Sequence, residues 1–184
     1  VQHYLDDLKT VETTPFIGYS REHKTYVFPD KAVSCDRVYE RNDEDFFEIG
    51  NLSIKSLNKS LHLHIGERKD YRQDWLNHIH TAFGARGLMT LTWFFGSLFA
   101  EQIRALHKSY PFLEVVGEAG AGKSTLIEAL WKLVGRTDYE GFDPNKSTQA
   151  ARSRNMTQVA NLPVSLILNS EKHKRPIGFP WNML

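Results

Sequence analysis

The feature that most constrains this chain is a glycine-rich octapeptide between an apolar run and a helical pattern. The octapeptide fits the pattern G-x-x-x-x-G-K-[S/T] and reads Gly117-Glu118-Ala119-Gly120-Ala121-Gly122-Lys123-Ser124. The apolar run at 112–116 predicts a short buried strand, and residues 124–133 predict a helix. Strand, glycine loop and helix in this order are the setting in which the pattern forms a phosphate-binding loop. The sequence therefore predicts that the chain binds a nucleoside triphosphate.

The residue types in this run suit a triphosphate. Glycines let the backbone bend so that successive N–H groups face the phosphates, and the following helix N-terminus adds positive partial charge. We expect the Lys123 ammonium to reach the β- and γ-phosphates, and the Ser124 hydroxyl to ligate Mg²⁺. Thr125 is expected to contact the α-phosphate side. The predicted cofactors are thus ATP and Mg²⁺, held by residues 117–125.

A second apolar run gives the other half of such a site less completely. Residues 164–168 predict a compact strand, and they are followed by Asn169, Ser170 and Glu171. The aspartate that usually follows this strand to hold the Mg²⁺ water shell is absent. Asn169 is expected to hold a metal-bound water through its amide oxygen, and Glu171 to supply the catalytic carboxylate. The alternative is a buried strand with a polar exit, and the missing acid favours nucleotide binding over rapid hydrolysis.

The chain divides into three predicted parts. Residues 1–70 form a small β-rich module, with short β-prone runs at 16–19, 25–28, 37–39 and 46–50. Residues 71–110 form a helical connector, with one helix ending at Gly84 and an apolar one over about 86–110. Residues 111–184 form the nucleotide domain, with a further helix from Thr148 to about Ala160. The predicted fold class is α/β. It is a P-loop NTPase parallel sheet with crossover helices (a partial core), preceded by a small antiparallel β module and an apolar helical pair.

Cysteine content and hydropathy bear on where the chain works. Cys35 is the only cysteine, so no intramolecular disulfide can form, and a cytoplasmic location is expected. The most apolar stretch, Leu88–Ala100, has 13 residues, fewer than the roughly 20 needed to cross a bilayer. It predicts a buried helix and no membrane partner. The chain starts without Met and stops soon after residues 164–168, so we expect a fragment of a longer polypeptide.

Two weaker groups of residues have a functional and an ordinary interpretation. Four histidines (62, 64, 78 and 80) could suggest a metal, but their spacings match no zinc pattern, and surface or partly buried histidines are favoured. Arg152 and Arg154 precede the second apolar run, where they could contact DNA or a neighbouring subunit's phosphates. Solvated charges are the favoured interpretation of these two arginines.

From about residue 16 to residue 170 the chain resembles the ATPase part of primase–helicase proteins of phages, plasmids and integrative elements. The similar segments are 26–30, the apolar helix 88–100 ahead of 112–117, and 147–152 leading into 162–167. The resemblance implies a ring-forming, AAA-like ATPase, homo-oligomeric in the full-length protein, that moves along or remodels DNA. Lys123 and Ser124 correspond to that family's nucleotide and Mg²⁺ ligands. The family's Walker-B aspartate corresponds only to Asn169.

Other proteins with this loop remain as alternatives. A transporter ATPase would carry a Leu-Ser-Gly-Gly-type signature, which is missing. A GTPase would carry Asn-Lys-x-Asp, and the run at 145–148 lacks that aspartate. A small-molecule kinase would need an arginine-bearing lid and an acceptor pocket after the second strand. A nucleotide-binding assembly or switch module with little hydrolysis is favoured by Asn169.

Overall fold

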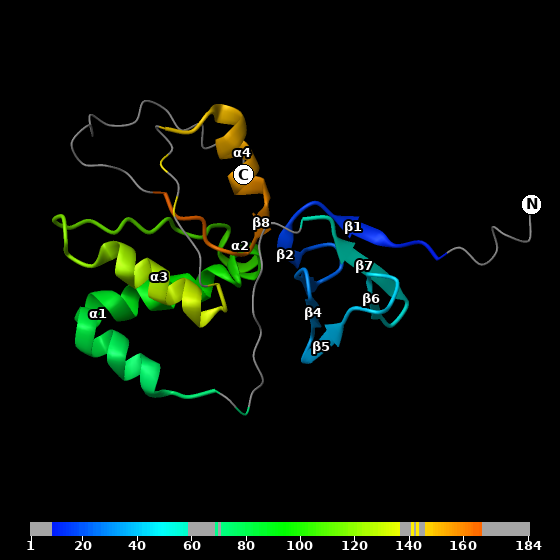
Figure 1. The fold of residues 1–184 in the computed structure, drawn as a ribbon, viewed down its shortest axis with the longest axis horizontal. Coiled ribbons are helices and arrows are strands. Elements are labelled where there is room, and N and C mark those ends of the chain that lie inside the picture. Colours follow the sequence, from blue (N-terminus) through cyan, green and yellow to red (C-terminus); the bar gives the residue numbers. More distant parts are fainter. Residues whose placement is uncertain are drawn as a thin grey trace, which may run out of the picture.

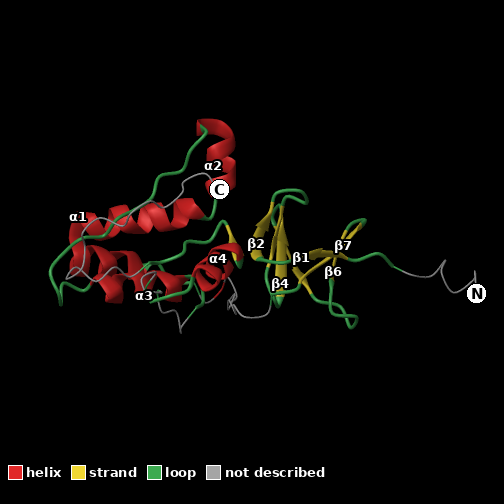
Figure 2. Ribbon diagram, turned by 90° about the horizontal axis from the view of Figure 1, so that it is seen from above, coloured by secondary structure: helices red, strands yellow, loops and turns green. Residues whose placement is uncertain are grey.

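The computed structural model describes residues 9–58, 69, 71–136, 141, 143 and 146–166. Strands gather at one end of the molecule and helices at the other (Figures 1 and 2). In chain order the elements are β1 (Glu12–Thr14), β2 (Ile17–Ser20), β3 (Thr25–Val27), β4 (Lys31–Ser34), β5 (Arg37–Glu40), β6 (Phe47–Ile49), β7 (Leu52–Ser56), α1 (Asp74–Ser97), α2 (Ala100–His107), α3 (Lys123–Leu133), α4 (Gln149–Thr157) and β8 (Val159–Ala160).

The strands form two small sheets. One has three strands in the order β1-β7-β6, and the other has five in the order β5-β4-β3-β2-β8. Period-two burial explains their shared core: Thr25 and Val27 of β3 are fully buried, while Tyr26 between them points to the other face. The core of this module consists of Val27, Ala32, Phe47 and Ile54. Each of the four predicted β-prone runs contains an observed strand, whereas β1, β4, β7 and β8 were not predicted.

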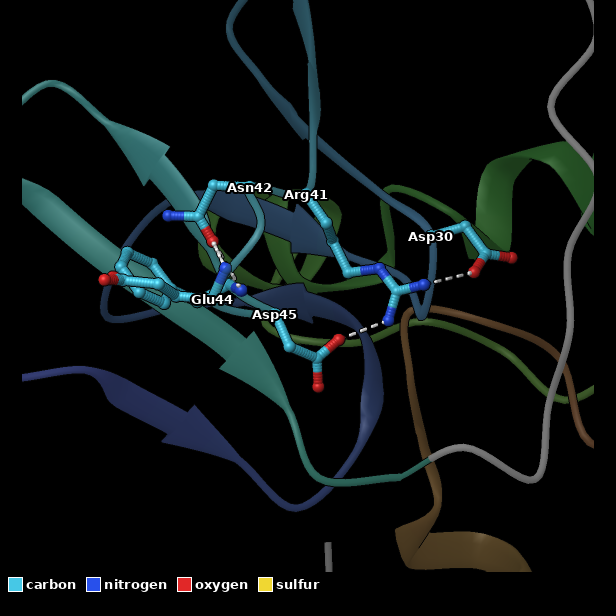
Figure 3. Close-up of polar contacts among 6 residues, drawn as sticks. Asp30, Arg41, Asn42, Glu44 and Asp45 are labelled. Atoms are coloured by element: carbon cyan, nitrogen blue, oxygen red, sulfur yellow. Dashed lines mark hydrogen bonds and ion pairs between the residues drawn. The ribbon is translucent and has the colours of Figure 1, made fainter.

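The turn between β5 and β6 is held by one asparagine and one arginine (Figure 3). The Asn42 side-chain oxygen accepts hydrogen bonds from the backbone N–H groups of Glu44 and Phe46, both at 3.1 Å. This is an Asx-type turn, which explains why a polar run connects the two strands. The Arg41 guanidinium reaches the carboxylates of Asp30 and Asp45. Because these charged groups are partly exposed, we expect the two ion pairs to contribute little to the free energy of folding.

Helix α1 folds back on itself at Gly84. The backbone there has φ 60° and ψ −153°, a region that essentially only glycine occupies. Beyond it the two halves of α1 approach again, since the rings of Trp75 and Phe95 have centroids 6.2 Å apart. The prediction that a helix ends at Gly84 is confirmed. The single helix predicted over about 86–110 is wrong, because non-helical backbone at Phe99 separates α1 from α2.

Helix α3 packs beside the bend of α1 (Figure 1). The Trp131 ring meets Phe94 edge to face, with centroids 5.5 Å apart. The helical core also contains one residue of β2 and one of the segment after β8. Its buried members are Ile17, Ile79, Leu91, Phe94, Leu126, Leu130, Trp131 and Leu162. The predicted helix over 124–133 is therefore confirmed, and its apolar face explains its position.

The chain returns to the β module after α4. Strand β8 pairs in parallel with β2, with Ile17 opposite Val159 and Gly18 opposite Ala160. The predicted helix from Thr148 begins as expected, because the Thr148 hydroxyl caps it by accepting from the Ala151 N–H at 3.2 Å. It ends at Thr157, three residues short of the prediction. Val159 and Ala160, at the end of the predicted helix, form β8 and pair with β2 instead.

The predicted fold class is wrong. The described sheets are mostly antiparallel. Two strand pairs are parallel, β1 with β7 and β2 with β8, and neither pair includes the strands predicted at 112–116 and 164–168. Residues 112–116, expected to form a buried strand, have no strand structure, and Phe112 and Val116 are 68% and 80% exposed. A short apolar run fits a buried strand only if partners flank it, and periodicity cannot supply that information. Of the second predicted strand, residues 164–166 contain only a single bridge at Leu166, and the rest lies outside the described residues.

Within the ranges given above, the structure contains no helix that combines the length and the apolar character required to cross a bilayer. Helix α1, which includes most of the apolar stretch 88–100, is instead packed inside the protein through Leu91 and Phe94.

Candidate functional site

The candidate site is the glycine loop, residues 117–122, together with the start of α3. Gly120 and Gly122 have φ angles of 79° and 78°, left-handed backbone that glycine adopts without a steric penalty. A turn bond runs from the Ala121 N–H to the Glu118 carbonyl at 3.3 Å. The first helical bond of α3 runs from the Leu126 N–H to the Gly122 carbonyl at 2.9 Å. The two glycines therefore turn the chain sharply into the helix.

The Lys123 side chain folds back over this loop. Its Nζ donates to the carbonyl oxygens of Gly117 at 2.8 Å and Glu118 at 2.7 Å. The ammonium thus ties the beginning of the loop to the helix that follows it. Ser124 and Thr125, in the first turn of α3, are exposed. Three consecutive residues at the start of α3 thus carry one lysine charge, two hydroxyls and the first N–H groups of the helix.

This set of groups suits an anion with several oxygens. The first N–H groups of a helix have no partner within it, and its N-terminus carries positive partial charge. Helix N-termini preceded by glycine turns bind phosphates for these two reasons. Mg²⁺ needs only one or two protein oxygens when substrate phosphates and waters complete its shell. Ser124 can supply such an oxygen, so the donor set fits a magnesium–phosphate ligand.

Sequence reasoning missed one residue beside the loop. A Cβ placed on Gly122 would lie 3.3 Å from Cε1 of Phe83, the residue before the α1 bend. The sequence predicts Phe83 only as part of the helix that ends at Gly84. The nearby Gly84 was a visible signal for a bend, but nothing in the sequence links that bend to the glycine loop.

The segment leading into the loop lies along α1. The Trp93 indole N–H donates to the Pro111 carbonyl at 2.8 Å, and the Tyr110 hydroxyl donates to the Trp93 carbonyl. Burial of this hydroxyl raises the pKa of Tyr110 above its ordinary value. These bonds place residues 110 and 111 on α1 before the exposed stretch 112–116.

Of the other predicted site residues, the structure describes His78, His80, Arg152 and Arg154. Asn169, Glu171, His62 and His64 lie outside the described residues. His78 and His80 are exposed on α1, and Arg152 and Arg154 lie on α4, half-buried and exposed respectively. Among the residues that the structure describes, no three His, Cys, Asp or Glu side chains are grouped to hold a metal.

Comparisons of the chain with protein-family models, with curated proteins and with solved structures give no match. The resemblance to primase–helicase ATPases therefore stays a prediction from the sequence.

Proposed function

We propose that this chain binds the phosphates of a Mg²⁺-bound nucleoside triphosphate, ATP in the first instance, at residues 117–125. The observation that carries the proposal is the loop geometry: two left-handed glycines lead directly into α3, and Lys123 is folded onto the loop carbonyls. The two hydrogen bonds of the Lys123 ammonium tie residues 117 and 118 to the start of α3. A phosphate can then bind with little further ordering of the backbone, which lowers the entropic cost of binding.

Each residue of the loop has a distinct part in this proposal. The backbone N–H groups that follow Gly122, at the start of α3, donate to phosphate oxygens, and Lys123 neutralises their charge. Ser124 ligates the Mg²⁺, and Thr125 contacts the phosphate nearer the nucleoside. Bound Mg²⁺ supplies charge neutralisation between neighbouring phosphates. Glu118, Ala119 and Ala121 contribute backbone only.

The wider activity that we propose is a DNA-directed, helicase-like ATPase acting in the cytoplasm as a ring of identical subunits. Its support is the sequence resemblance together with the loop geometry. In this proposal Glu171 is the catalytic carboxylate and Asn169 holds a metal-bound water. DNA-stimulated ATP hydrolysis by the full-length protein is the expected result. Hydrolysis that is indifferent to any nucleic acid would contradict the DNA-directed part while leaving nucleotide binding intact.

The direct test of nucleotide binding is calorimetric titration of this chain with ATP and with GTP in the presence of Mg²⁺, followed by the same titrations with single-stranded DNA. We expect saturable heat with one site per chain. Tripolyphosphate with Mg²⁺ serves as a probe of the phosphate contacts alone. Absence of heat with every ligand, from a sample that unfolds cooperatively, would overturn the proposal.

A second candidate function is a nucleotide-dependent assembly switch that hydrolyses ATP slowly. The observation that favours it is Asn169 in the place where an acidic metal-holding residue is expected. The variant Asn169→Asp separates the two functions. A large rise in turnover favours the switch, whereas unchanged turnover means that another residue already supplies the acid.

A further inference from the structure

The bend of α1 lies against the glycine loop. Phe83 is the last residue before the bend, and its ring edge is 3.3 Å from the place where a Gly122 side chain would begin. The ring is partly buried and packs on the helical core. Gly122 is also the residue whose carbonyl starts α3 and whose neighbour is Lys123. The Phe83 ring therefore lies beside Gly122, the residue after which the proposed phosphate contacts begin.

The backbone at Gly84 presents the Phe83 ring. Its φ of 60° and ψ of −153° are essentially restricted to glycine, and no atom lies within 4 Å of a Cβ placed there. Packing therefore does not require a glycine at this position; the backbone conformation does. Unusual backbone of this kind persists where the surrounding structure imposes it, and it is common beside binding sites.

We propose that Phe83, presented by the Gly84 bend, is a positioning residue of the phosphate loop. This inference rests on the proposed nucleotide-binding function and extends it to a residue outside the sequence motif. Glycine-rich backbone has many conformations to lose on binding. The Phe83 ring occupies the space into which Gly122 would move in other conformations, and so keeps the loop in the form that binds phosphate.

The position of Phe83 also links the loop to the shape of α1. The two halves of α1 meet again at their far ends through Trp75 and Phe95, and α3 packs on the core between them through Phe94 and Trp131. Residues on both sides of the bend therefore reach α3, Phe83 near its start and Phe94 near its end.

The test compares Phe83→Leu with Phe95→Leu. Both residues are partly buried aromatics of α1 packed on the same core, so both substitutions remove similar volume and lower the unfolding midpoint. Only Phe83 touches the loop position. We expect Phe83→Leu to weaken the affinity for Mg²⁺-ATP on the order of tenfold, and Phe95→Leu to change it by less than about twofold. In ligand-free protein, the NMR order parameters measured from the amide signals of Gly120, Gly122 and Lys123 should fall in Phe83→Leu and stay unchanged in Phe95→Leu.

The outcomes separate this inference from the proposed function. If the wild-type chain binds no Mg²⁺-nucleotide, the proposed function fails, and the order parameters of the ligand-free loop amides alone decide whether Phe83 orders the loop. If the wild type binds and the two variants lose affinity equally, Phe83 has only a general packing role and the inference is overturned. Unchanged order parameters of the loop amides in Phe83→Leu overturn it as well.

Discussion

Gly18 and Ala160 lie so close together that only a glycine fits at the first position. A Cβ on Gly18 would lie 1.9 Å from the carbonyl oxygen of Ala160, and the Gly18 φ angle is 120°. The two residues are opposite each other in the parallel pairing of β2 with β8. This pairing joins the end of the described chain to the β module, so the absence of one methyl group permits a long-range connection.

We expect Gly18→Ala to destabilise the protein by about 3 kcal/mol, because the added methyl collides with backbone and the φ angle is strained. The strand β8 should separate from β2. The measurement is the free energy of unfolding in urea, with hydrogen exchange at Val159 and Ala160 reporting the pairing.

The matched control is Gly50→Ala. Gly50 has a φ angle of 62°, and a Cβ there would meet no atom within 4 Å. This substitution carries backbone strain alone, which costs about 1 kcal/mol. Equal losses for the two variants would mean that the Ala160 carbonyl does not limit Gly18.

Lys123→Ala should weaken Mg²⁺-ATP binding about a hundredfold, since hydrogen bonds to charged groups contribute about 1.5–3 kcal/mol each. Calorimetric titration measures the loss. Lys132→Ala is the control, because Lys132 is exposed in the last turn of the same helix and should leave affinity unchanged. Similar affinities for the two variants would show that the lysine on the loop has no part in binding.

Asn161 connects the segment after β8 to the start of α2. Its side-chain oxygen accepts from the Glu101 N–H at 3.0 Å, and its side-chain nitrogen donates to the Gln102 oxygen, also at 3.0 Å. The φ angle of 56° is left-handed, so glycine can keep the backbone. Asn161→Gly should cost about 1–2 kcal/mol of stability, because it removes two hydrogen bonds and leaves the Glu101 N–H without the oxygen that accepts from it. Thermal unfolding of the purified variant measures it.

The conservative variant Asn161→Asp keeps an oxygen that accepts from the Glu101 N–H and places negative charge near the N-terminus of α2. It should lose less stability than Asn161→Gly. A larger loss in Asn161→Asp would indicate that the hydrogen bond to Gln102, rather than the cap, holds this junction.

Tyr26 should make stability fall at high pH. Burial raises the pKa of its phenol above the ordinary value of 10.0, with hydrogen bonds to Asn161 and Gln102 acting in the opposite direction. Above about pH 10 the unfolded chain loses this proton before the folded protein does, so ionisation favours unfolding. The contribution is complete below the unfolded pKa and is lost as pH rises through the folded pKa.

The comparison is urea unfolding of wild type and Tyr26→Phe at about pH 8 and about pH 11. At the lower pH the variant should be about 1 kcal/mol less stable, because it lacks the hydrogen bond to the Leu98 carbonyl. At the higher pH the wild type should have lost more stability than the variant. Parallel losses would show that other groups cause the alkaline destabilisation.

Local structure was largely predictable from the sequence. The helix predicted over 124–133, which begins one residue earlier at Lys123, and the end of a helix at Gly84 follow from short-range rules on glycine and helix periodicity. The left-handed φ angles of Gly120 and Gly122 agree with a glycine loop in which the backbone bends. The β-prone runs between residues 16 and 50 likewise each contain a strand. The three-part division of the chain and the nucleotide, metal and DNA partners remain predictions.

Tertiary structure decided which segments pair. Residues 112–116 are as apolar as a buried strand, but no neighbouring strand covers them in the described structure, whereas Val159 and Ala160, predicted as helix, pair with β2. Gly18 is visible in the sequence. The reason for a glycine there is that any Cβ would collide with the Ala160 carbonyl oxygen, and this reason exists only once Ala160 lies beside Gly18. Likewise, the sequence contains Phe83 and Gly122 but does not show that they are neighbours in the folded protein. Hydrophobic and turn-forming patterns act over a few residues, and the contacts between distant segments depend on how their surfaces fit after the chain has folded.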